Sequence, residues 1–257
     1  MTDEATLNEA AAKLREASRT RTPIDPLTVR WPHLDVDDAW RIQQINRDVA
    51  VAAGRRVDGY KCGLTSAAMQ RQMGVDEPDF GVLLDDMLLA DRMAAQAFVQ
   101  PRVEAEVALV LGADVGAGAT AASVLAATAS VRPAIEIIDS RIADWQLSLV
   151  DTVADNASSG AYVLGPPLAP EGLDLAEIEV TVSVNDEVRD IGRGSAALGH
   201  PAAAAAWLAN RLAGFGLVLK AGSVVLTGSL HASFPVTPGD RVVADFGVLG
   251  RSTVDVH

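Results

Sequence analysis

The sequence has a single cysteine, Cys62, among its 257 residues. One thiol excludes an internal disulfide framework and a cysteine-rich zinc site. Basic residues are also scarce, because 21 Lys and Arg stand against 34 Asp and Glu, which gives a net charge of −13. Nucleic acids and anionic membranes both select a basic surface on the proteins that bind them. Neither is therefore expected as the main partner.

Long apolar segments are absent as well. No stretch of about 20 apolar residues occurs, so no membrane-spanning helix is expected. The N-terminal stretch MTDEATLNEAAAKLREASRTR carries charges where a secretory signal peptide has an apolar run. These features predict a cytoplasmic protein with a globular core.

Two common kinds of catalytic motif are missing. The 4 histidines are scattered and form no H-E-x-x-H or triad-like setting, which disfavours a histidine-based hydrolase or a zinc enzyme. The glycines of GRGSAALG lack the strand–turn–helix context of a dinucleotide site, so NAD is not expected. Cys62 lies in an apolar strand pattern and is interpreted as a packed thiol rather than a nucleophile.

The periodicity of the chain divides it into a helical start and a β-rich remainder. Apolar residues in the segment 1–55 recur every three or four positions, which predicts two amphipathic helices. The segment 56–257 consists mainly of short β-type runs broken by Gly, Pro and Asp, with helices expected at 119–129 and 201–215. Several strands follow one another without a helix between them, which favours a mixed α+β sheet. We expect one domain over residues 1–257.

The segment PRVEAEVALVLG carries the first candidate site residues. Strict alternation places Glu104 and Glu106 on one face of a strand and the apolar residues on the other. The two Cα atoms would be roughly 6.5–7 Å apart, so both carboxylates can converge on one cation. The same pattern also fits an antiparallel strand with a solvated acidic face.

A third carboxylate follows in RPAIEIIDSRI. Glu136 is flanked by isoleucines, where an unpaired carboxylate is costly. Its partner is either Arg132 or Arg141 in an ion pair, or a divalent metal shared with the two earlier glutamates. Oxygen donors without cysteine or histidine favour Mg²⁺ or Mn²⁺ over zinc.

The stretch GYKCGLTS places Lys61 among small and apolar residues, between a predicted strand and the start of a helix near Ala67. Such a lysine either reaches from the strand end to solvent or meets a negative charge inside a site. Thr65 and Ser66 either cap that helix or, if its first amides open onto a site, hold a substrate carboxylate.

Together these segments resemble one family. GYKCGLTSAAMQRQMGVDEPDFG, VEAEVALVLG, AIEIIDSRIADWQLSLVDTVADNASSG and LGHP are similar to the 2-keto-4-pentenoate hydratases. That family also contains 4-oxalocrotonate decarboxylases and belongs to the fumarylacetoacetate hydrolase superfamily. The resemblance covers nearly the whole chain. It implies a fumarylacetoacetate hydrolase-like mixed β-roll with flanking helices and an N-terminal helical segment.

The resemblance also implies site residues. It assigns Glu104, Glu106 and Glu136 to a divalent ion, Mg²⁺ or Mn²⁺, and Lys61 to stabilisation of a developing enolate, with proton transfer as the alternative if burial lowers its pKa. Asp79, in the acidic turn GVDEPDFG, becomes a catalytic carboxylate, although solvated turn acids are common in such loops. The neighbouring Asp76 is a weaker candidate.

Two further assignments concern the segment from Asp139 to Gly160. The polar residues of DTVADNASSG fit helix caps and turns, but the family places this segment beside the pocket, so Ser159 is assigned to substrate binding together with Thr65 and Ser66. Asp139 and Arg141 are expected to form an ion pair or to brace the metal-bearing strand. Trp145 is interpreted as a packing residue.

The implied activity is hydration of 2-hydroxypenta-2,4-dienoate (2-keto-4-pentenoate), or a substituted analogue, to a 4-hydroxy-2-oxo acid in aromatic or sterol ring catabolism. A 2-oxo-3-enedioate decarboxylase of the same family is the first alternative, which a basic residue at the far end of the pocket would favour. A non-catalytic partner subunit is an alternative of another class. The family further implies a homo-oligomer and association with a pathway enzyme such as an aldolase or decarboxylase.

Overall fold

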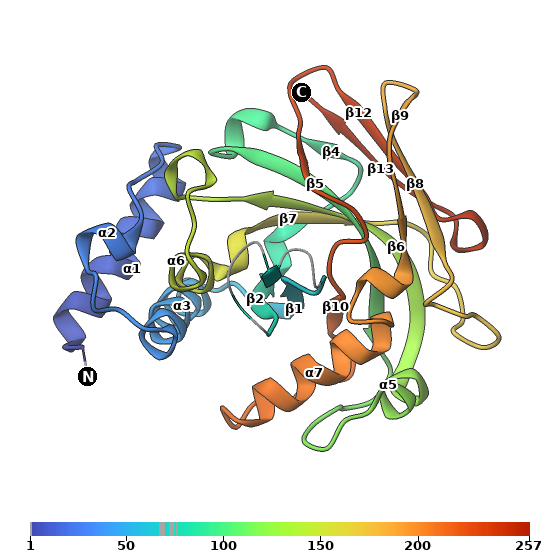
Figure 1. Cartoon of the computed structure of the whole chain (residues 1–257), viewed down its shortest axis with the longest axis horizontal. Helices are drawn as coiled ribbons and strands as arrows, with labels where there is room; N and C mark the ends of the chain where they lie inside the picture. The colour runs from blue at the N-terminus through green and yellow to red at the C-terminus, as the bar shows by residue number, and fades with distance from the viewer. Residues whose placement is uncertain (1, 67–69, 72–74, 76) are drawn as a thin grey trace.

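The computed structural model describes residues 2–66, 70–71, 75 and 77–257 (Figure 1). Ala67, near which a helix is predicted to begin, and Asp76 lie outside the described residues, whereas Gln70 and Arg71 are described and helical. In the described part of the chain, no helix is long and apolar enough to cross a membrane.

The N-terminal segment forms α1 (Glu4–Thr20), α2 (Leu27–Arg30) and α3 (Val36–Ala52). Asp3 and Asp35 cap the two long helices, because each aspartate side chain accepts a hydrogen bond from a backbone N–H of the first turn. The predicted apolar stripe of α1 is buried, from Leu7 to Ala17. These helices lie together on one side of the molecule, beside α6 (Leu149–Ala154) (Figure 1).

A large mixed sheet forms the centre of the molecule. Its strand order is β2-β1-β10-β5-β6-β7-β3, with β11 paired to β5. The bounds are β1 (Val57–Gly63), β2 (Asp79–Leu84), β3 (Leu88–Leu89), β5 (Pro101–Leu111), β6 (Thr128–Asp139), β7 (Ser159–Leu164), β10 (Val224–Leu226) and β11 (Phe234–Pro235). Most neighbours pair antiparallel, but β1 with β10 and β3 with β7 are parallel.

A second sheet stands beside the first, in the order β4-β13-β12-β8-β9 (Figure 1). Its strands are β4 (Arg92–Met93), β8 (Glu179–Val184), β9 (Glu187–Arg193), β12 (Arg241–Asp245) and β13 (Arg251–Val256). Short 3₁₀ turns occupy Asp85–Met87, Ala95–Ala97, Ala143–Trp145, Asn156–Ser158, Gly194–Ala196 and Gly247–Leu249. The expected mixed α+β architecture is confirmed.

Two further helices, α5 (Ala121–Ala127) and α7 (Pro201–Ala213), pack against each other. The helix expected at 119–129 is shorter, because the Thr120 side chain caps its first turn and β6 already begins at Thr128. His200 caps α7, as its Nδ1 accepts from the Ala202 amide at 3.0 Å.

The two faces of the central sheet differ in what they bury. Val103, Val107 and Leu109 of β5 belong to the main apolar core on one face, as the alternation predicts. A small cluster containing Tyr162 and Leu226 lies apart from that core. Strand register places it on the opposite face, the one that carries the candidate site.

Candidate metal centre and active site

The strand register brings the three glutamates together. In the antiparallel β5–β6 pair Glu104 lies directly opposite Glu136, so the two side chains project to the same side. Glu106 is two residues further along β5 and shares that face. The antiparallel strand expected from the E-x-E pattern is therefore present, but its acidic face points into the molecule.

The same register adds Lys61 and Asp79 to this face. Lys61 of β1 pairs with Leu226 of β10, and Leu226 pairs with Ala108, which lies two residues from Glu106. Asp79 pairs with Gly63, two residues from Lys61. Because side chains alternate along a strand, all five charged groups project from one face of the sheet.

The three glutamates can hold a metal ion. One carboxylate oxygen from each lies within 4.8 Å of the others, and Glu106 and Glu136 are fully buried. Glu106 Oε2 accepts from the Gly228 amide at 2.7 Å. The Oε1 atoms of Glu106 and Glu136 have no hydrogen-bond partner among the described residues. Buried unpaired carboxylate oxygens are costly, and a hard divalent cation would satisfy them.

The arginines proposed as alternative partners of Glu136 are engaged elsewhere. Arg132 donates from Nε to the Gly165 carbonyl at 2.7 Å. Arg141 forms an ion pair with Asp155 at 2.5 Å. Lys61 is the cation beside Glu136, with Nζ 3.2 Å from Oε2.

Lys61 is buried, so the interpretation of a lysine that reaches solvent is wrong. Its Nζ also donates to the Ala157 carbonyl at 2.9 Å. Burial by itself lowers the pKa of Lys61, but the nearby carboxylates, Glu136 foremost, outweigh burial and raise that pKa. The ammonium form is therefore favoured, and a neutral lysine base, which the sequence left open, is not.

The carboxylates have raised pKa values for the same reasons. Burial, opposed by Lys61 and reinforced by Glu136, raises the pKa of Glu104 to about 7. Burial and the charge of Glu136 raise the pKa of Glu106 well above its ordinary value. Burial also raises the pKa of Glu136 despite the nearby ammonium. Removing this repulsion is a further reason for a cation to bind there.

Asp79 is buried rather than solvated on a turn, because β2 begins at this residue. Its Oδ2 accepts from the Thr152 hydroxyl at 3.2 Å, and its Oδ1 has no hydrogen-bond partner among the described residues. Burial raises its pKa. Gly63 makes room for it, since a Cβ there would lie 2.1 Å from Asp79 Oδ1.

A cavity of about 340 Å³ opens onto this cluster. Four predicted site residues besides Glu104 line it: Lys61, Asp79, Thr65 and Ser66. Ser159 is not among the lining residues of this cavity, whereas its neighbour Ser158 is. Ser159 lines a second cavity on the other side of the turn.

Comparison with known proteins agrees with this geometry. The family model described as "Fumarylacetoacetate (FAA) hydrolase C-terminal" matches residues 66–257. The chain belongs to the fumarylacetoacetate hydrolase family.

Curated relatives in this family carry hydratase names. The chain is 48% identical, over 90% of its length and 88% of the relative's, to a 2-keto-4-pentenoate hydratase of Paraburkholderia xenovorans (strain LB400). It is 42% identical to a 2-hydroxyhexa-2,4-dienoate hydratase of Comamonas testosteroni, covering 100% of this chain and 99% of the relative.

A solved structure of a family member is closely similar. The 4-oxalocrotonate decarboxylase from Pseudomonas putida G7, complexed with magnesium and adipate, superimposes with a TM-score of 0.96 at 34% identity. The match covers 100% of this chain and 99% of that chain. The fumarylacetoacetate hydrolase-like fold expected from the sequence is confirmed.

One residue that lines the catalytic cavity, Arg102, was not singled out as a site residue from the sequence. Arg102 lines the cavity and donates from Nε and Nη2 to the hydroxyl and carbonyl oxygens of Ser233, at 2.8 and 2.5 Å. Its guanidinium lies 5.7 Å from the ring centroid of Trp145, which also lines the cavity. The sequence did contain a pattern that indicates this placement, because Arg102 precedes Glu104 by two positions in the same strand and therefore shares its face.

His231, which lines the catalytic cavity, and Cys62 are both held by contacts with the backbone. His231 Nε2 accepts from the Ala105 amide at 2.9 Å, and Nδ1 lies 2.8 Å from the Ala232 carbonyl. Both contacts fit the neutral ring, and burial lowers its pKa. Cys62 belongs to the main core, and burial raises the pKa of its thiol. Both observations agree with the interpretation of Cys62 as a packed thiol.

A strained turn joins the site to the protein interior. Asn156, Ala157 and Ser158 have φ values of 58°, 49° and 54°, a left-handed conformation that is costly for residues other than glycine. Asn156 binds both backbone groups of Val82, accepting at 2.7 Å and donating at 2.9 Å. In this conformation Ala157 and Ser158 line the catalytic cavity.

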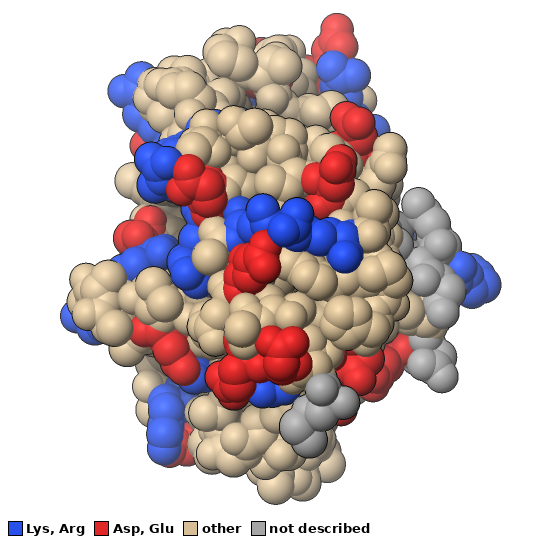
Figure 2. All heavy atoms as spheres, turned by 90° about the vertical axis from the view of Figure 1, so that its left-hand side faces the viewer, with Lys and Arg blue, Asp and Glu red and all other residues tan. Residues whose placement is uncertain are grey.

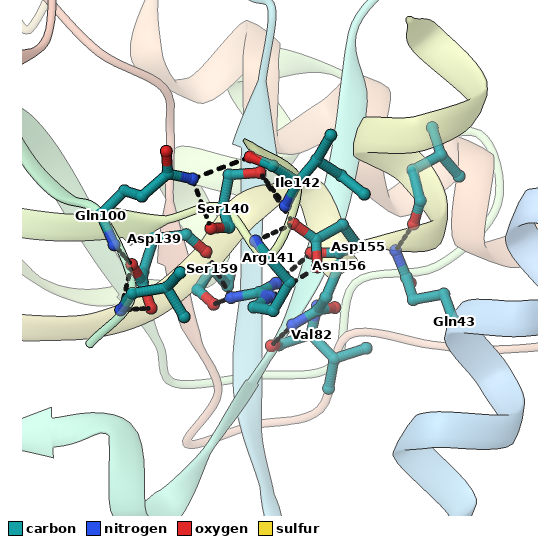
Figure 3. A network of polar contacts seen from close by, with 12 residues as sticks. Gln43, Val82, Gln100, Asp139, Ser140, Arg141, Ile142, Asp155, Asn156 and Ser159 are labelled. Atoms are coloured by element: carbon teal, nitrogen blue, oxygen red, sulfur yellow. Dashed lines mark hydrogen bonds and ion pairs between the residues drawn. The ribbon is translucent and has the colours of Figure 1, made fainter. Parts of the chain in front are cut away.

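Arg141 holds the start of this turn (Figure 3). Its guanidinium bonds the Asp155 carboxylate and carbonyl and donates to the Ser159 carbonyl at 2.9 Å. The expected Asp139–Arg141 ion pair is not the contact formed, since Arg141 bonds only the Asp139 carbonyl. The Asp139 carboxylate instead accepts from the amides of Val99 and Gln100.

Proposed function

We propose that this protein is a metal-dependent hydratase of 2-hydroxypenta-2,4-dienoate or a substituted analogue, giving a 4-hydroxy-2-oxo acid. The observation that carries the proposal is the cluster of half-buried Glu104 and buried Glu106 and Glu136, beside Lys61, at a cavity of about 340 Å³ that Lys61 and Glu104 line. The hydratase names of relatives at 42–48% identity agree with it.

The three glutamates would hold Mg²⁺ or Mn²⁺. A bound divalent ion supplies a Lewis acid for the adjacent carboxylate and 2-oxo oxygens of such a substrate. The magnesium in the Pseudomonas putida G7 decarboxylase structure supports a hard cation. The donor set of carboxylate oxygens suits either ion.

Lys61 stabilises the negative charge that develops on the substrate. When the 2-hydroxydienoate loses its enol proton, charge grows on the 2-oxygen, and a desolvated ammonium stabilises it more strongly than water does. The raised pKa keeps Lys61 charged for this role. The Ala157 carbonyl, which accepts from its Nζ, fixes the direction of the ammonium group.

Asp79 is assigned to proton movement. A proton must be added at C5 to form the conjugated 2-oxo-3-enoate, and water must then add its oxygen at C4 and its proton at C3. Burial raises the pKa of Asp79, which makes this carboxyl a better proton carrier than an exposed aspartate, and Thr152 fixes its orientation. Thr65, Ser66 and Ser158 complete the polar wall for the substrate. Ser159 lines the other cavity, so it would affect substrate binding only indirectly, by supporting the turn that carries Ser158.

Arg102 is the residue we assign to a substrate carboxylate. It lines the cavity, and the described residues place only neutral oxygen atoms of Ser233 in hydrogen bonds with it. A basic residue in the pocket also favours the second candidate function, decarboxylation of a 2-oxo-3-enedioate, whose substrate has two carboxylates. The structural similarity to a 4-oxalocrotonate decarboxylase agrees with this alternative.

Three further properties belong to the proposal. We infer a cytoplasmic homo-oligomer that associates with an aldolase or decarboxylase of the same pathway. The alternative of a non-catalytic partner subunit is disfavoured by the intact set of three glutamates and Lys61, which a scaffold has no physical need to retain buried at this cost.

A product assay tests the activity. Purified protein is incubated with 2-hydroxypenta-2,4-dienoate and, separately, with 2-oxohex-3-enedioate, with Mg²⁺ or Mn²⁺ or with chelator. Mass spectrometry should show a metal-dependent gain of one water on the first substrate. Loss of CO₂ from the second substrate without hydration of the first would identify the decarboxylase instead, and inactivity on both would favour the non-catalytic subunit.

A further inference from the structure

A second, larger cavity lies behind the catalytic turn, between helices α1 and α3 and the strands β2 and β7. It encloses about 730 Å³, within the range of small-molecule sites. Five arginines line it, against two carboxylates. The arginines are Arg15, Arg19, Arg47, Arg55 and Arg141. Figure 2 views the molecule from the side of α1 and α3, and Lys and Arg side chains form a band across that face.

Both lining carboxylates are already satisfied by the protein. Asp155 is held by Arg141, and Asp139 accepts from two backbone amides. Neither is free to pair with the arginines of α1 and α3. The lining therefore has more arginines than carboxylates, although Arg19, Arg47 and Arg55 pair with Glu16, Asp48 and Asp86, which do not line the cavity.

The peripheral arginines can turn to a ligand. Arg15 donates to the side-chain oxygen of Asn46 at 2.5 Å, which is a neutral partner. Arg47 pairs with Asp48 at 2.6 Å, and the Asp48 side chain is 66% exposed and does not line the cavity. Exposed ion pairs of this kind contribute little to stability, so exchanging the partner is inexpensive.

Two buried polar atoms in the wall have no partner among the described residues. They are Gln43 Oε1 and Ser159 Oγ, on residues that are 1% and 3% exposed. The Gln43 amide nitrogen is already used, donating to the Phe80 and Val153 carbonyls. An occupant with a hydroxyl group would satisfy these oxygens, because Gln43 Oε1 can only accept.

We propose that this cavity binds a small anion that carries at least two acidic groups and a hydroxyl, either a hydroxy-polycarboxylate or a hydroxylated phosphate ester. The arginines would take the acidic groups in charge-assisted hydrogen bonds. Gln43 and Ser159 would take the hydroxyl. The site is separate from the catalytic cavity and does not depend on the proposed hydratase activity.

The position of this second cavity links it to Lys61. Asp155, Asn156 and Ser159 line the second cavity, while Ala157 and Ser158 line the catalytic one. One strained turn thus separates the two cavities, and its Ala157 carbonyl accepts from Lys61. An anion bound behind the turn would hold it in place and slow its opening.

Isothermal titration calorimetry on the full chain, dialysed free of metal, tests the site with citrate, tricarballylate and glycerol 3-phosphate. Citrate or glycerol 3-phosphate should bind with one site per chain. Tricarballylate, which is citrate without its hydroxyl, should bind about tenfold more weakly than citrate. Amide hydrogen exchange in residues 155–160 should slow when the tighter anion is bound.

Three variants locate the binding. Arg15→Gln combined with Arg47→Gln should lower the association constant by about tenfold or more, whereas Arg241→Gln, which removes an exposed acid-paired arginine on β12, should leave it unchanged. Arg102→Gln should also leave it unchanged. The proposal is overturned if neither citrate nor glycerol 3-phosphate gives a heat of binding. It is also overturned if the association constant of the Arg15/Arg47 double variant is not lowered, or if Arg102→Gln abolishes binding.

Discussion

Lys61 and Glu136 form an ion pair inside the molecule, with Nζ 3.2 Å from Oε2, although β10 and β5 lie between their strands in the sheet. The contact is possible because all these strands present alternate residues to the same face. It places one cation against three carboxylates, of which Glu104 lines the catalytic cavity together with Lys61. This arrangement determines most of the behaviour expected of the protein.

Glu106→Gln should abolish metal-dependent activity without loss of folding. The amide keeps the volume of the side chain but removes a charged ligand, so the affinity for Mg²⁺ or Mn²⁺ should fall by about 100-fold or more. Calorimetric titration with metal and the Tm of the metal-free variant measure the two effects. Glu187→Gln, at an exposed position on β9, is the matched control. Full activity of the wild type after dialysis against chelator would refute the metal assignment.

Metal binding should strengthen as pH rises through about 7. The pKa of Glu104 is raised to about 7 and that of Glu106 lies well above its ordinary value. Protons therefore compete with the metal for Glu104 at pH 6 and much less at pH 8. Raised pKa values in the folded state also mean that the metal-free protein loses stability as pH increases through them. The rise in Tm caused by Mg²⁺ should thus be larger at pH 8, and an equal rise at both pH values would contradict this account.

Lys61→Ala should lower kcat by about 10²- to 10³-fold, because the ammonium meets a charge that grows in the transition state. KM should change much less. Steady-state kinetics at saturating metal measures both constants, and Lys220→Ala, which removes an exposed lysine paired with Asp114, serves as the control. An unchanged kcat would assign Lys61 a structural role only.

Gly63→Ala should impair both stability and catalysis. Its Cβ would lie 2.1 Å from Asp79 Oδ1, so the carboxyl must move, at a cost of about 1–3 kcal/mol in unfolding free energy. Gly116→Ala is the matched control, since its Cβ meets only Val218 methyl groups at 3.7 and 3.9 Å. Denaturant titration and kcat should separate the two variants. Equal behaviour would mean that the position of Asp79 does not matter for the reaction.

Arg102→Gln should raise KM by about 10- to 100-fold through loss of a charge-assisted hydrogen bond to the substrate carboxylate. The affinity for metal should stay within about twofold, because Arg102 is no ligand. Ser233→Ala should produce a smaller increase, since it removes only the hydroxyl that accepts from Nε and keeps the carbonyl that accepts from Nη2 and the charge of the guanidinium. A KM that does not respond to either substitution would exclude Arg102 from substrate recognition.

Local patterns were sufficient for part of this site. Alternation in β5 predicted that Glu104 and Glu106 share one face, and the isoleucines around Glu136 predicted that its carboxylate is buried. Both follow from the two-residue period of a strand and the cost of burying a charge. The resemblance to a family then supplied the fold and the partners of these residues.

Other features depended on long-range contacts. The solvated-turn reading of Asp79 failed because β2 begins at that residue and pairs with β1, which buries the carboxyl. Ser159 was predicted to lie in the catalytic pocket. A turn of left-handed residues places Ser158 at the catalytic cavity instead, and Ser159 lines the other cavity. The sequence pattern allowed a turn here, but it did not predict three successive left-handed residues, since none of them is a glycine.

The sequence by itself determined the chemical type of the site, because the scarcity of basic residues, strand alternation and acids within apolar runs can be read from composition and neighbouring residues. Only the tertiary structure decided which charges meet. Lys61 on β1 pairs with Glu136 on β6 across the face of the two strands between them, β10 and β5. Arg141 pairs with Asp155 rather than with Asp139 or Glu136. Pairing between groups far apart in the chain depends on strand order and register, which the free energy of the whole sheet determines rather than any one segment.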